Sequence, residues 1–193
     1  MADLIFYTGP MGSAKTAHAL MTNFQYEDRG KKVWLIKPSI DTREHMRYGE
    51  DGKVKQTLVK SRIGLEAWAD AINYDDDIIP PTTTDIIICD EAQFLSTKQV
   101  DQLKRIADTR GITVLCFGLR TDFQSNLFEG AKRLFELAST IQMLPVICDC
   151  GNAAVINARI VDGNIVTEGA QVDIGGDEKY RAFCYACWRK YSK

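Results

Sequence analysis

The sequence Gly9-Pro-Met-Gly-Ser-Ala-Lys-Thr16 joins an apolar run, Leu4–Thr8, to a helix-forming segment that opens with Lys15 and Thr16. A strand, a glycine-rich turn and a helix in this order predict a phosphate-binding loop. The backbone N–H groups of such a loop and the positive end of the helix dipole converge on phosphate oxygens. Lys15 would add a positive charge for the outer phosphates, and the Thr16 hydroxyl is a candidate Mg²⁺ ligand. The candidate nucleotide-binding residues are Gly9, Pro10, Met11, Gly12, Ser13, Ala14, Lys15 and Thr16.

Ala14 departs from the usual motif, G-x-x-x-x-G-K-[ST], which has glycine directly before the lysine. A methyl group there is unfavourable if the backbone needs a positive φ or a very close approach of phosphate. An additional glycine, Gly12, lies two positions earlier and could relax the loop. We therefore expect nucleotide binding to be retained, and an ordinary glycine-rich turn is the alternative interpretation.

The composition indicates a soluble globular protein. The chain has 193 residues, of which 45% are hydrophobic and 26% are charged, enough for one good core and a small additional lobe. A net charge of −2 provides no general basic field for nucleic acid or an anionic membrane. Apolar stretches are too short to span a bilayer, and Asp3 stands where a signal peptide would carry positive charge. We expect a cytoplasmic protein without nucleic-acid or membrane partners.

Apolar strand-like runs alternate with helix-like segments along the first 145 residues. This alternation predicts an α/β fold of the P-loop class, a mostly parallel sheet with helices on both faces. From about residue 146 the pattern changes to cysteines, short strands and glycine turns. We predict a nucleotide-binding domain at 1–145 and a small lobe at 146–193. Helices are expected at 15–29, 63–72, 96–110 and 127–138, and strands at 33–37, 54–59, 85–89, 113–117 and 140–144.

Asp90 and Glu91 follow the apolar strand 85–89, in the manner of a Walker B element. The carboxyl end of a buried parallel strand lies beside the phosphate loop, at the sheet edge where ligands bind. Asp90 would hold Mg²⁺ through water, and Glu91 would face the reacting group. Alternatively, the pair simply caps the next turn.

Four of the six cysteines form two close pairs near the C-terminus, Cys148-x-Cys150 and Cys184-x-x-Cys187. Two such pairs are typical of a zinc ribbon, and four thiolates leave no position for water, so this Zn²⁺ would be structural. Free thiols or a disulfide are the alternatives. Cys89 and Cys116 lie in apolar runs and are expected in the core.

Four motifs together resemble the small, zinc-bearing type II thymidine kinases. They are Gly9-Pro-Met, Asp90-Glu-Ala-Gln-Phe94, Gly118-Leu-Arg-Thr-Asp-Phe123 and Ile174-Gly-Gly176, in this order along essentially the whole chain. The resemblance implies transfer of the γ-phosphoryl group of ATP to the 5′-hydroxyl of thymidine, giving dTMP. It also implies Mg²⁺, structural Zn²⁺ and a homo-oligomer, usually a tetramer.

The resemblance also implies residue roles. Glu91 matches the general base that takes the proton of the 5′-hydroxyl, and a carboxylate ionised at neutral pH suits this role. Asp41 and Arg43 match a loop in which the acid assists the metal and the arginine neutralises charge during transfer; a solvated loop is the alternative. Phe94, Leu119, Phe123 and Phe128 match the apolar walls around thymine. Ile174, Gly175 and Gly176 match the lasso loop that closes over the nucleoside, and Tyr180 matches its end, near the sugar.

Two other functions remain open on the sequence. A P-loop ATPase would use Glu91 to activate water and its zinc ribbon to contact nucleic acid. A non-catalytic nucleotide-binding protein would keep the fold without turnover, and Ala14 is the only reason to consider it.

Overall fold

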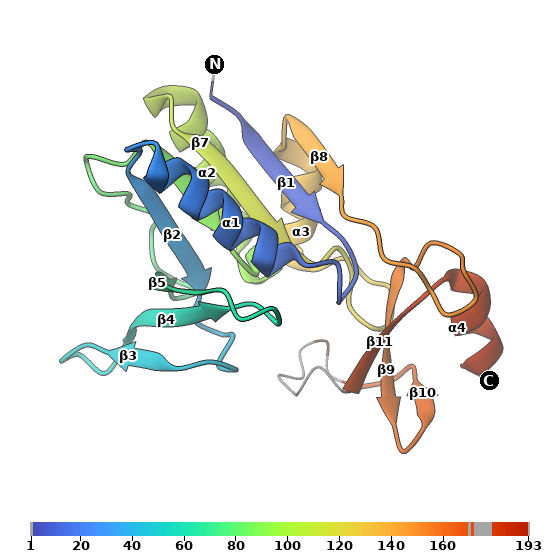
Figure 1. Ribbon diagram of the computed structural model, residues 1–193. Helices are drawn as coiled ribbons and strands as arrows, with labels where there is room; N and C mark the ends of the chain where they lie inside the picture. The colour runs from blue at the N-terminus through green and yellow to red at the C-terminus, as the bar shows by residue number, and fades with distance from the viewer. Residues whose placement is uncertain (1, 170, 172–178, 193) are drawn as a thin grey trace.

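An eight-stranded sheet forms the centre of the chain in the computed structural model, which describes residues 2–169, 171 and 179–192 (Figure 1). Its strand order is β3-β4-β5-β2-β6-β7-β1-β8. The six strands from β5 to β8 in this order are mutually parallel, whereas β3 and β4 pair antiparallel at one edge. The predicted α/β fold with a mostly parallel sheet is therefore confirmed. The strands are β1 (Leu4–Thr8), β2 (Val33–Pro38), β3 (Met46–Tyr48), β4 (Val54–Lys60), β5 (Glu66–Ile72), β6 (Ile86–Cys89), β7 (Thr113–Gly118) and β8 (Thr140–Met143).

Helices cover both faces of this sheet. Helix α1 (Lys15–Asp28) lies on one face, while α2 (Thr97–Arg110) and α3 (Glu129–Leu137) lie on the other (Figure 1). Each face has its own apolar cluster. Ala19 and Leu20 of α1 pack with the strands in one cluster, and Leu103 and Leu134, from α2 and α3, pack in the other. Alternate residues of a buried strand point to opposite faces, so β6 contributes Ile88 to the α1 side and Ile87 to the α2 side.

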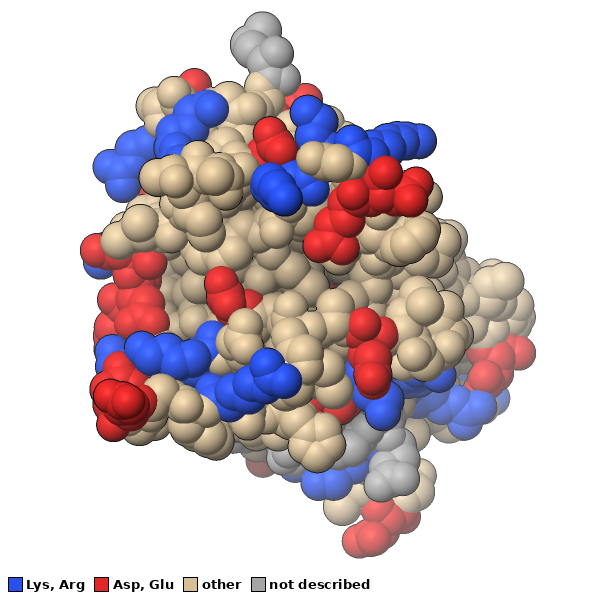
Figure 2. Space-filling view, turned by 60° about the vertical axis from the view of Figure 1, so that its left-hand side comes forward, with Lys and Arg blue, Asp and Glu red and all other residues tan. Residues whose placement is uncertain are grey.

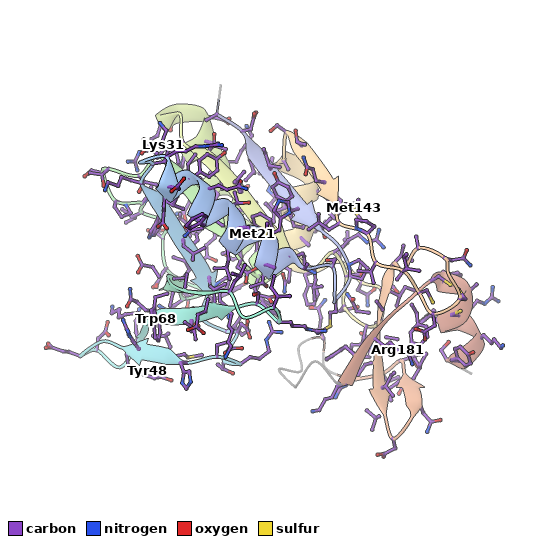
Figure 3. The ribbon with its side chains drawn as sticks, viewed as in Figure 1. Met21, Lys31, Tyr48, Trp68, Met143 and Arg181 are labelled. Atoms are coloured by element: carbon purple, nitrogen blue, oxygen red, sulfur yellow. The ribbon has the colours of Figure 1, made fainter. Side chains whose placement is uncertain are left out.

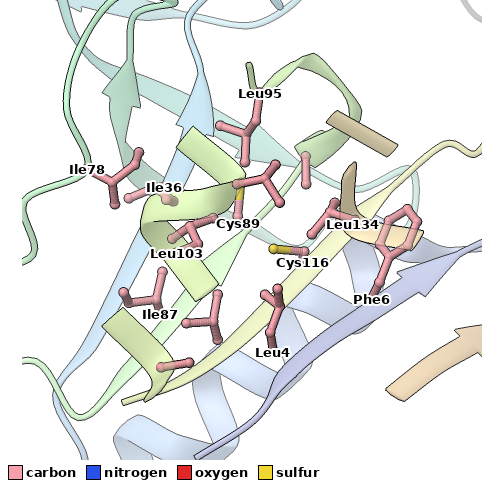
Figure 4. Packing of buried hydrophobic residues seen from close by; sticks show 14 of the residues in the cluster. Leu4, Phe6, Ile36, Ile78, Ile87, Cys89, Leu95, Leu103, Cys116 and Leu134 are labelled. Atoms are coloured by element: carbon pink, nitrogen blue, oxygen red, sulfur yellow. The ribbon is translucent and has the colours of Figure 1, made fainter. Parts of the chain in front are cut away.

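The cluster beneath α2 and α3 is the larger of the two and includes both isolated cysteines (Figure 4). Cys89 and Cys116 are fully buried and lie opposite each other on β6 and β7. They act as small apolar side chains, as the sequence predicted.

Local signals explain the position of α2. Ser96 accepts a hydrogen bond from the backbone N–H of Gln99, and the Gln99 side chain accepts one from the backbone N–H of Ser96. This reciprocal capping box satisfies two N–H groups that a helix start leaves unpaired. Gly111 ends the helix with φ 67°, a conformation that favours glycine.

The helix predicted at 63–72 is wrong: residues 63–65 belong to a turn, and the rest form strand β5, paired with β4 on one side and β2 on the other. Its apolar residues are compatible with either period over so short a segment. The turn before it decides the structure. Gly64 has φ 86°, and the hydrogen bonds between Ser61 and Leu65 close a hairpin that returns the chain beside β4. The short strand β3, within the predicted loop after residue 39, was also missed.

A second sheet follows the first and is called the C-terminal sheet below. It comprises β9 (Ile156–Val161), β10 (Asn164–Val166) and β11 (Tyr180–Phe183), in the antiparallel order β10-β9-β11, followed by α4 (Tyr185–Tyr191). It has a small apolar cluster of its own that includes Cys148, Ala158 and Phe183. In the part of the chain that the structure describes, no helix is long and apolar enough to cross a bilayer.

Candidate active site

The ends of four parallel strands bring the predicted site residues to one edge of the main sheet. The phosphate loop follows β1, Asp41 and Arg43 follow β2, Asp90 and Glu91 follow β6, and Leu119 follows β7. Because the carboxyl ends of parallel strands share one edge, residues far apart in the sequence meet there. This edge carries the candidate active site.

Lys15 is folded against the phosphate loop. Its Nζ donates hydrogen bonds to the carbonyl oxygens of Gly9 (2.9 Å) and Pro10 (2.8 Å) and to Ser13 Oγ (3.1 Å). Burial lowers the pKa of Lys15 to about 8, a shift that the negative charges of Glu91 and Asp90 partly oppose. The lysine thus holds its charge at neutral pH while weakly solvated, which suits a phosphate contact.

Ala14 has the left-handed backbone conformation that the motif reserves for glycine. Its φ is 58° and its ψ is 27°, and Gly12 also has a positive φ, 84°. An L-residue with a side chain is strained in this region by roughly 1–2 kcal/mol. The chain adopts the loop conformation nevertheless, so the methyl group strains the loop without abolishing it.

Asp90 and Thr16 bring a carboxylate and a hydroxyl together beneath the loop. Thr16 Oγ1 donates to Asp90 Oδ2 at 3.1 Å, and Asp90 is only 3% exposed. Burial, together with the nearby charge of Glu91, raises the pKa of Asp90 to about 7, although Lys37 and Thr16 oppose the shift. The Asp90 carboxylate and the Thr16 hydroxyl are adjacent oxygen donors of the kind that a hard cation prefers.

Glu91 is held by Arg43, which also contacts Asp41. Arg43 donates to Glu91 Oε1 at 2.6 Å and to both carboxylate oxygens of Asp41 at 2.6 and 2.8 Å. Lys37 Nζ contacts Asp41 Oδ2 at 2.8 Å. Burial alone would raise the pKa of Asp41, but the hydrogen bonds and charges of Arg43 and Lys37 outweigh it and hold this pKa at about 2. The loop after β2 is therefore ordered against the acidic pair.

The residues predicted to bind the nucleoside lie in two separate groups. Phe94 and Phe128 meet edge to face, with ring centroids 5.6 Å apart. Phe128 belongs to the apolar cluster beneath α2 and α3, against which Phe94 and Leu119 also pack. Phe123 is 1% exposed and faces the guanidinium of Arg159, on β9, at 5.5 Å. Tyr180 begins β11. Ile174, Gly175 and Gly176 lie outside the described residues.

The four late cysteines converge on one point. One Sγ atom from each of Cys148, Cys150, Cys184 and Cys187 lies within 4.8 Å of the others. Sulfur atoms around a tetrahedral zinc would lie about 3.8 Å apart, given Zn–S bonds of about 2.3 Å. All four are free, so the disulfide alternative is wrong. This donor set fits a metal ion.

Three residues in or beside the site were missed by sequence reasoning: Lys37, Gln93 and Asn157. Lys37 is a charged residue near the end of an apolar strand, and this unusual position is the signal in the sequence that could have pointed to it. In the structure it is 3% exposed. Gln93 stands inside a motif that was quoted without a role for it. Asn157 interrupts the apolar strand β9, and its Oδ1 accepts a hydrogen bond of 2.7 Å from the backbone N–H of Met11 in the phosphate loop.

Comparisons with known proteins agree with this geometry. A family model described as thymidine kinase matches residues 2–188. The thymidine kinase of Enterobacteria phage T4 is 40% identical over an alignment covering 100% of this chain and 98% of the relative. Thymidine kinases of Zymomonas mobilis (40% identical; 95% and 94% covered) and Cutibacterium acnes (41%; 95% and 87%) are similar. The chain belongs to the thymidine kinase family.

Proposed function

We propose that the protein is a thymidine kinase that transfers the γ-phosphoryl group of ATP to the 5′-hydroxyl of thymidine and releases dTMP and ADP. The observation that carries the proposal is the meeting of Glu91 and Arg43 at the sheet edge that also holds the phosphate loop. A base for the acceptor hydroxyl and a cation for the transferred group are what phosphoryl transfer requires beside a phosphate cradle.

Each group of site residues has a separate role in the proposed transfer. The loop N–H groups and Lys15 bind and orient the phosphates of ATP. Glu91 accepts the proton of the 5′-hydroxyl as its oxygen attacks the γ-phosphorus, and the bond to the bridging oxygen of ADP breaks. Arg43 lies 2.6 Å from Glu91 and can neutralise charge on the phosphoryl group as it moves. Phe94, Leu119, Phe123 and Phe128 would enclose the base, with Tyr180 near the sugar and Ile174, Gly175 and Gly176 closing over it.

Magnesium fits the oxygen donors of this site. Thr16 and Asp90 would hold it, and when bound it supplies positive charge to the phosphate oxygens. Asp41 is the third candidate ligand, but both its oxygens accept hydrogen bonds from Arg43 or Lys37, so a metal ion would compete with these ion pairs. The resulting expectation is that Asp41 chiefly orders Arg43.

We propose that the four late cysteines bind a zinc ion with a structural role. Four sulfur ligands complete a tetrahedral shell and leave no position for a reacting water. We treat residues 146–193 as the lobe that this metal stabilises and residues 1–145 as the nucleotide-binding domain. A cytoplasmic location is part of the proposal, since reducing compartments keep thiols free and all six cysteines are unpaired.

A homo-oligomer, by resemblance a tetramer, is also proposed. Met21 on α1 and Trp68 on β5, both labelled in Figure 3, are 50% and 38% exposed. Phe24, also on α1, is 67% exposed. Such exposed apolar side chains suit an interface between copies. On the face shown in Figure 2, basic and acidic side chains lie close to one another, a pattern less suited to nucleic acid than a continuous basic surface.

The test is ADP release by the purified protein with Mg²⁺-ATP and thymidine, deoxyuridine, deoxycytidine or no nucleoside. We expect release that depends on thymidine. Release without any nucleoside, stimulated by DNA, would favour the ATPase alternative. Nucleotide binding without release under all conditions would favour a non-catalytic protein.

A further inference from the structure

Gln93 lies between two parts of the proposed active site. It belongs to the short helix η1 (Ala92–Phe94), directly after Glu91, and is 1% exposed. Its Nε2 donates to Glu91 Oε2 at 2.6 Å, and its Oε1 accepts a hydrogen bond of 2.9 Å from the backbone N–H of Leu119. One buried amide thus joins the general base to the loop that follows β7.

The two partners fix the orientation of this amide. A carboxylate oxygen only accepts hydrogen bonds and a backbone N–H only donates them, so a flipped Gln93 would lose both contacts. Ionised glutamate in this position could keep the contact to Leu119 but would have no donor for Glu91 and would place a second negative charge beside it. The site therefore requires both ends of the amide.

The backbone around Gln93 is packed so closely that η1 has little room to shift. A Cβ at Gly118 would lie 2.6 Å from Gln93 Oε1, and a Cβ at Gly130 would lie 2.6 Å from the carbonyl oxygen of Ala92 and 3.0 Å from that of Gln93. Glycines at the end of β7 and in α3 are needed for this approach. Glu91 itself has a left-handed backbone conformation, φ 53°, which persists only where the surroundings enforce it.

The Glu91 carboxylate accepts hydrogen bonds from two side chains of different kinds. Arg43 contacts Oε1 from the loop after β2 and carries a charge that an incoming phosphoryl group attracts. Gln93 contacts Oε2 from the core side and is neutral. When Arg43 turns toward the phosphoryl group, Gln93 is the contact that keeps the carboxylate in place.

We propose that Gln93 is a positioning residue for phosphoryl transfer: its amide aims the Glu91 carboxylate and couples it to the Leu119 loop that contacts the nucleoside. The proposal rests on the function proposed above. It assigns the glutamine a role in kcat through Glu91, without contact to ATP.

The test compares Gln93→Met with Gln99→Met. Gln99 is a matched control because it is also a buried glutamine, 1% exposed, but its amide caps α2 and contacts the carbonyl oxygens of Asn73 and Asp76. A misplaced catalytic group costs on the order of 10–100-fold in rate. We expect Gln93→Met to lower kcat by about this factor with an unchanged KM for ATP, and Gln99→Met to lower Tm with kcat nearly unchanged. Gln93→Asn keeps a neutral amide but is one methylene shorter and cannot reach both partners, so it should resemble Gln93→Met in kcat, and it replaces that variant if Met prevents folding.

A double-mutant cycle with Glu91→Gln separates positioning from general damage. If Gln93 acts through Glu91, adding Gln93→Met (or Gln93→Asn) to Glu91→Gln should reduce kcat little further, whereas independent effects would multiply. Multiplying effects, or single Gln93 variants with the kcat of the wild type, would overturn the positioning role while the wild type remains an active kinase. A wild type without thymidine-dependent turnover would instead overturn the proposed function and this role with it.

Discussion

The side-chain carbonyl of Asn157, in β9, accepts a hydrogen bond of 2.7 Å from the backbone N–H of Met11 in the phosphate loop. The same amide donates to the carbonyl oxygen of Thr121 at 3.2 Å, and Asn157 is 4% exposed. The C-terminal sheet is therefore bonded directly to the phosphate loop and to the loop after β7. Changes in the C-terminal sheet should reach ATP binding as well as nucleoside binding.

Asn157→Leu should weaken both connections. It removes a hydrogen-bond partner from the part-buried N–H of Met11 and from the buried carbonyl of Thr121. An unsatisfied buried group costs about 1–3 kcal/mol, and a group that water can reach costs less. We expect a lower Tm and a higher KM for ATP, of the order of ten-fold, measured by thermal unfolding and by ADP release. Asn164→Leu is the control, since Asn164 is exposed in β10 and its side chain donates a hydrogen bond to the nearby carbonyl oxygen of Asp162. Equal KM values for ATP in the two variants would show that the contact to Met11 has no functional effect.

Ala14→Gly should stabilise the protein. The left-handed conformation of Ala14 is strained by about 1 kcal/mol or more, and glycine adopts it freely. We expect a free energy of unfolding higher by about 1 kcal/mol or less, because glycine also makes the unfolded chain more flexible, and a KM for ATP that is unchanged or lower. Ala17→Gly, within α1, should have the opposite effect on stability. Loss of stability in Ala14→Gly would mean that the strain is compensated locally.

The fold was largely predictable because its signals are local. The apolar runs at β1, β6 and β7 and the capping box at Ser96 each operate within a few residues. The helix prediction for 63–72 failed because Gly64 turns the chain into a hairpin. The resulting strand pairing outweighs the spacing of apolar residues, which is compatible with a helix or a strand. Among the candidate site residues, the motifs predicted Lys15, Asp90 and Glu91, and the structure brings these three to one sheet edge.

The contacts of Gln93 and Asn157 were not predictable in the same way. Asn157 and Met11 are 146 positions apart. No sequence pattern encodes a bond between two such residues, because it depends on how the C-terminal sheet packs against the main one. Gln93 stood in a recognised motif two positions after Glu91, but its contact with the backbone of Leu119, 26 positions later, depends on where β7 ends.

The pKa of Lys15 should make stability depend on pH. Its pKa is about 8 in the folded protein and near 10.5 in the unfolded chain, so between these values the unfolded chain binds more protons. Stability then rises with pH across this window, since the cost of burying the charged amine is present below pH 8 and disappears as pH rises. In ATP-free protein, the wild type should gain stability relative to Lys15→Met from pH 8 to pH 10. A constant difference between the two unfolding free energies would contradict the lowered pKa of this lysine. Lys60→Met, at an exposed lysine of β4, controls for removal of a charge.

Removing one of the four late cysteines should release the metal. We expect about one zinc per chain in the wild type by elemental analysis and a lower content in Cys187→Ser. Thymidine KM should rise more than ATP KM, although the Asn157 contact predicts some effect on both. Cys116→Ala is the control, because Cys116 is buried in the main core and should keep the zinc. A full zinc content in Cys187→Ser would exclude this residue as a ligand.

Transfer of label from γ-labelled ATP tests the central claim most directly, with wild type and Glu91→Gln compared at equal concentration. The wild type should place the label on thymidine as dTMP, and Glu91→Gln should bind ATP normally but transfer about 10²–10⁴-fold more slowly. Glu129→Gln is the matched control, since Glu129 is an exposed acid whose contacts to Thr97 and Tyr74 are structural. Label appearing as inorganic phosphate irrespective of thymidine, or equal transfer by wild type and Glu91→Gln, would contradict the account.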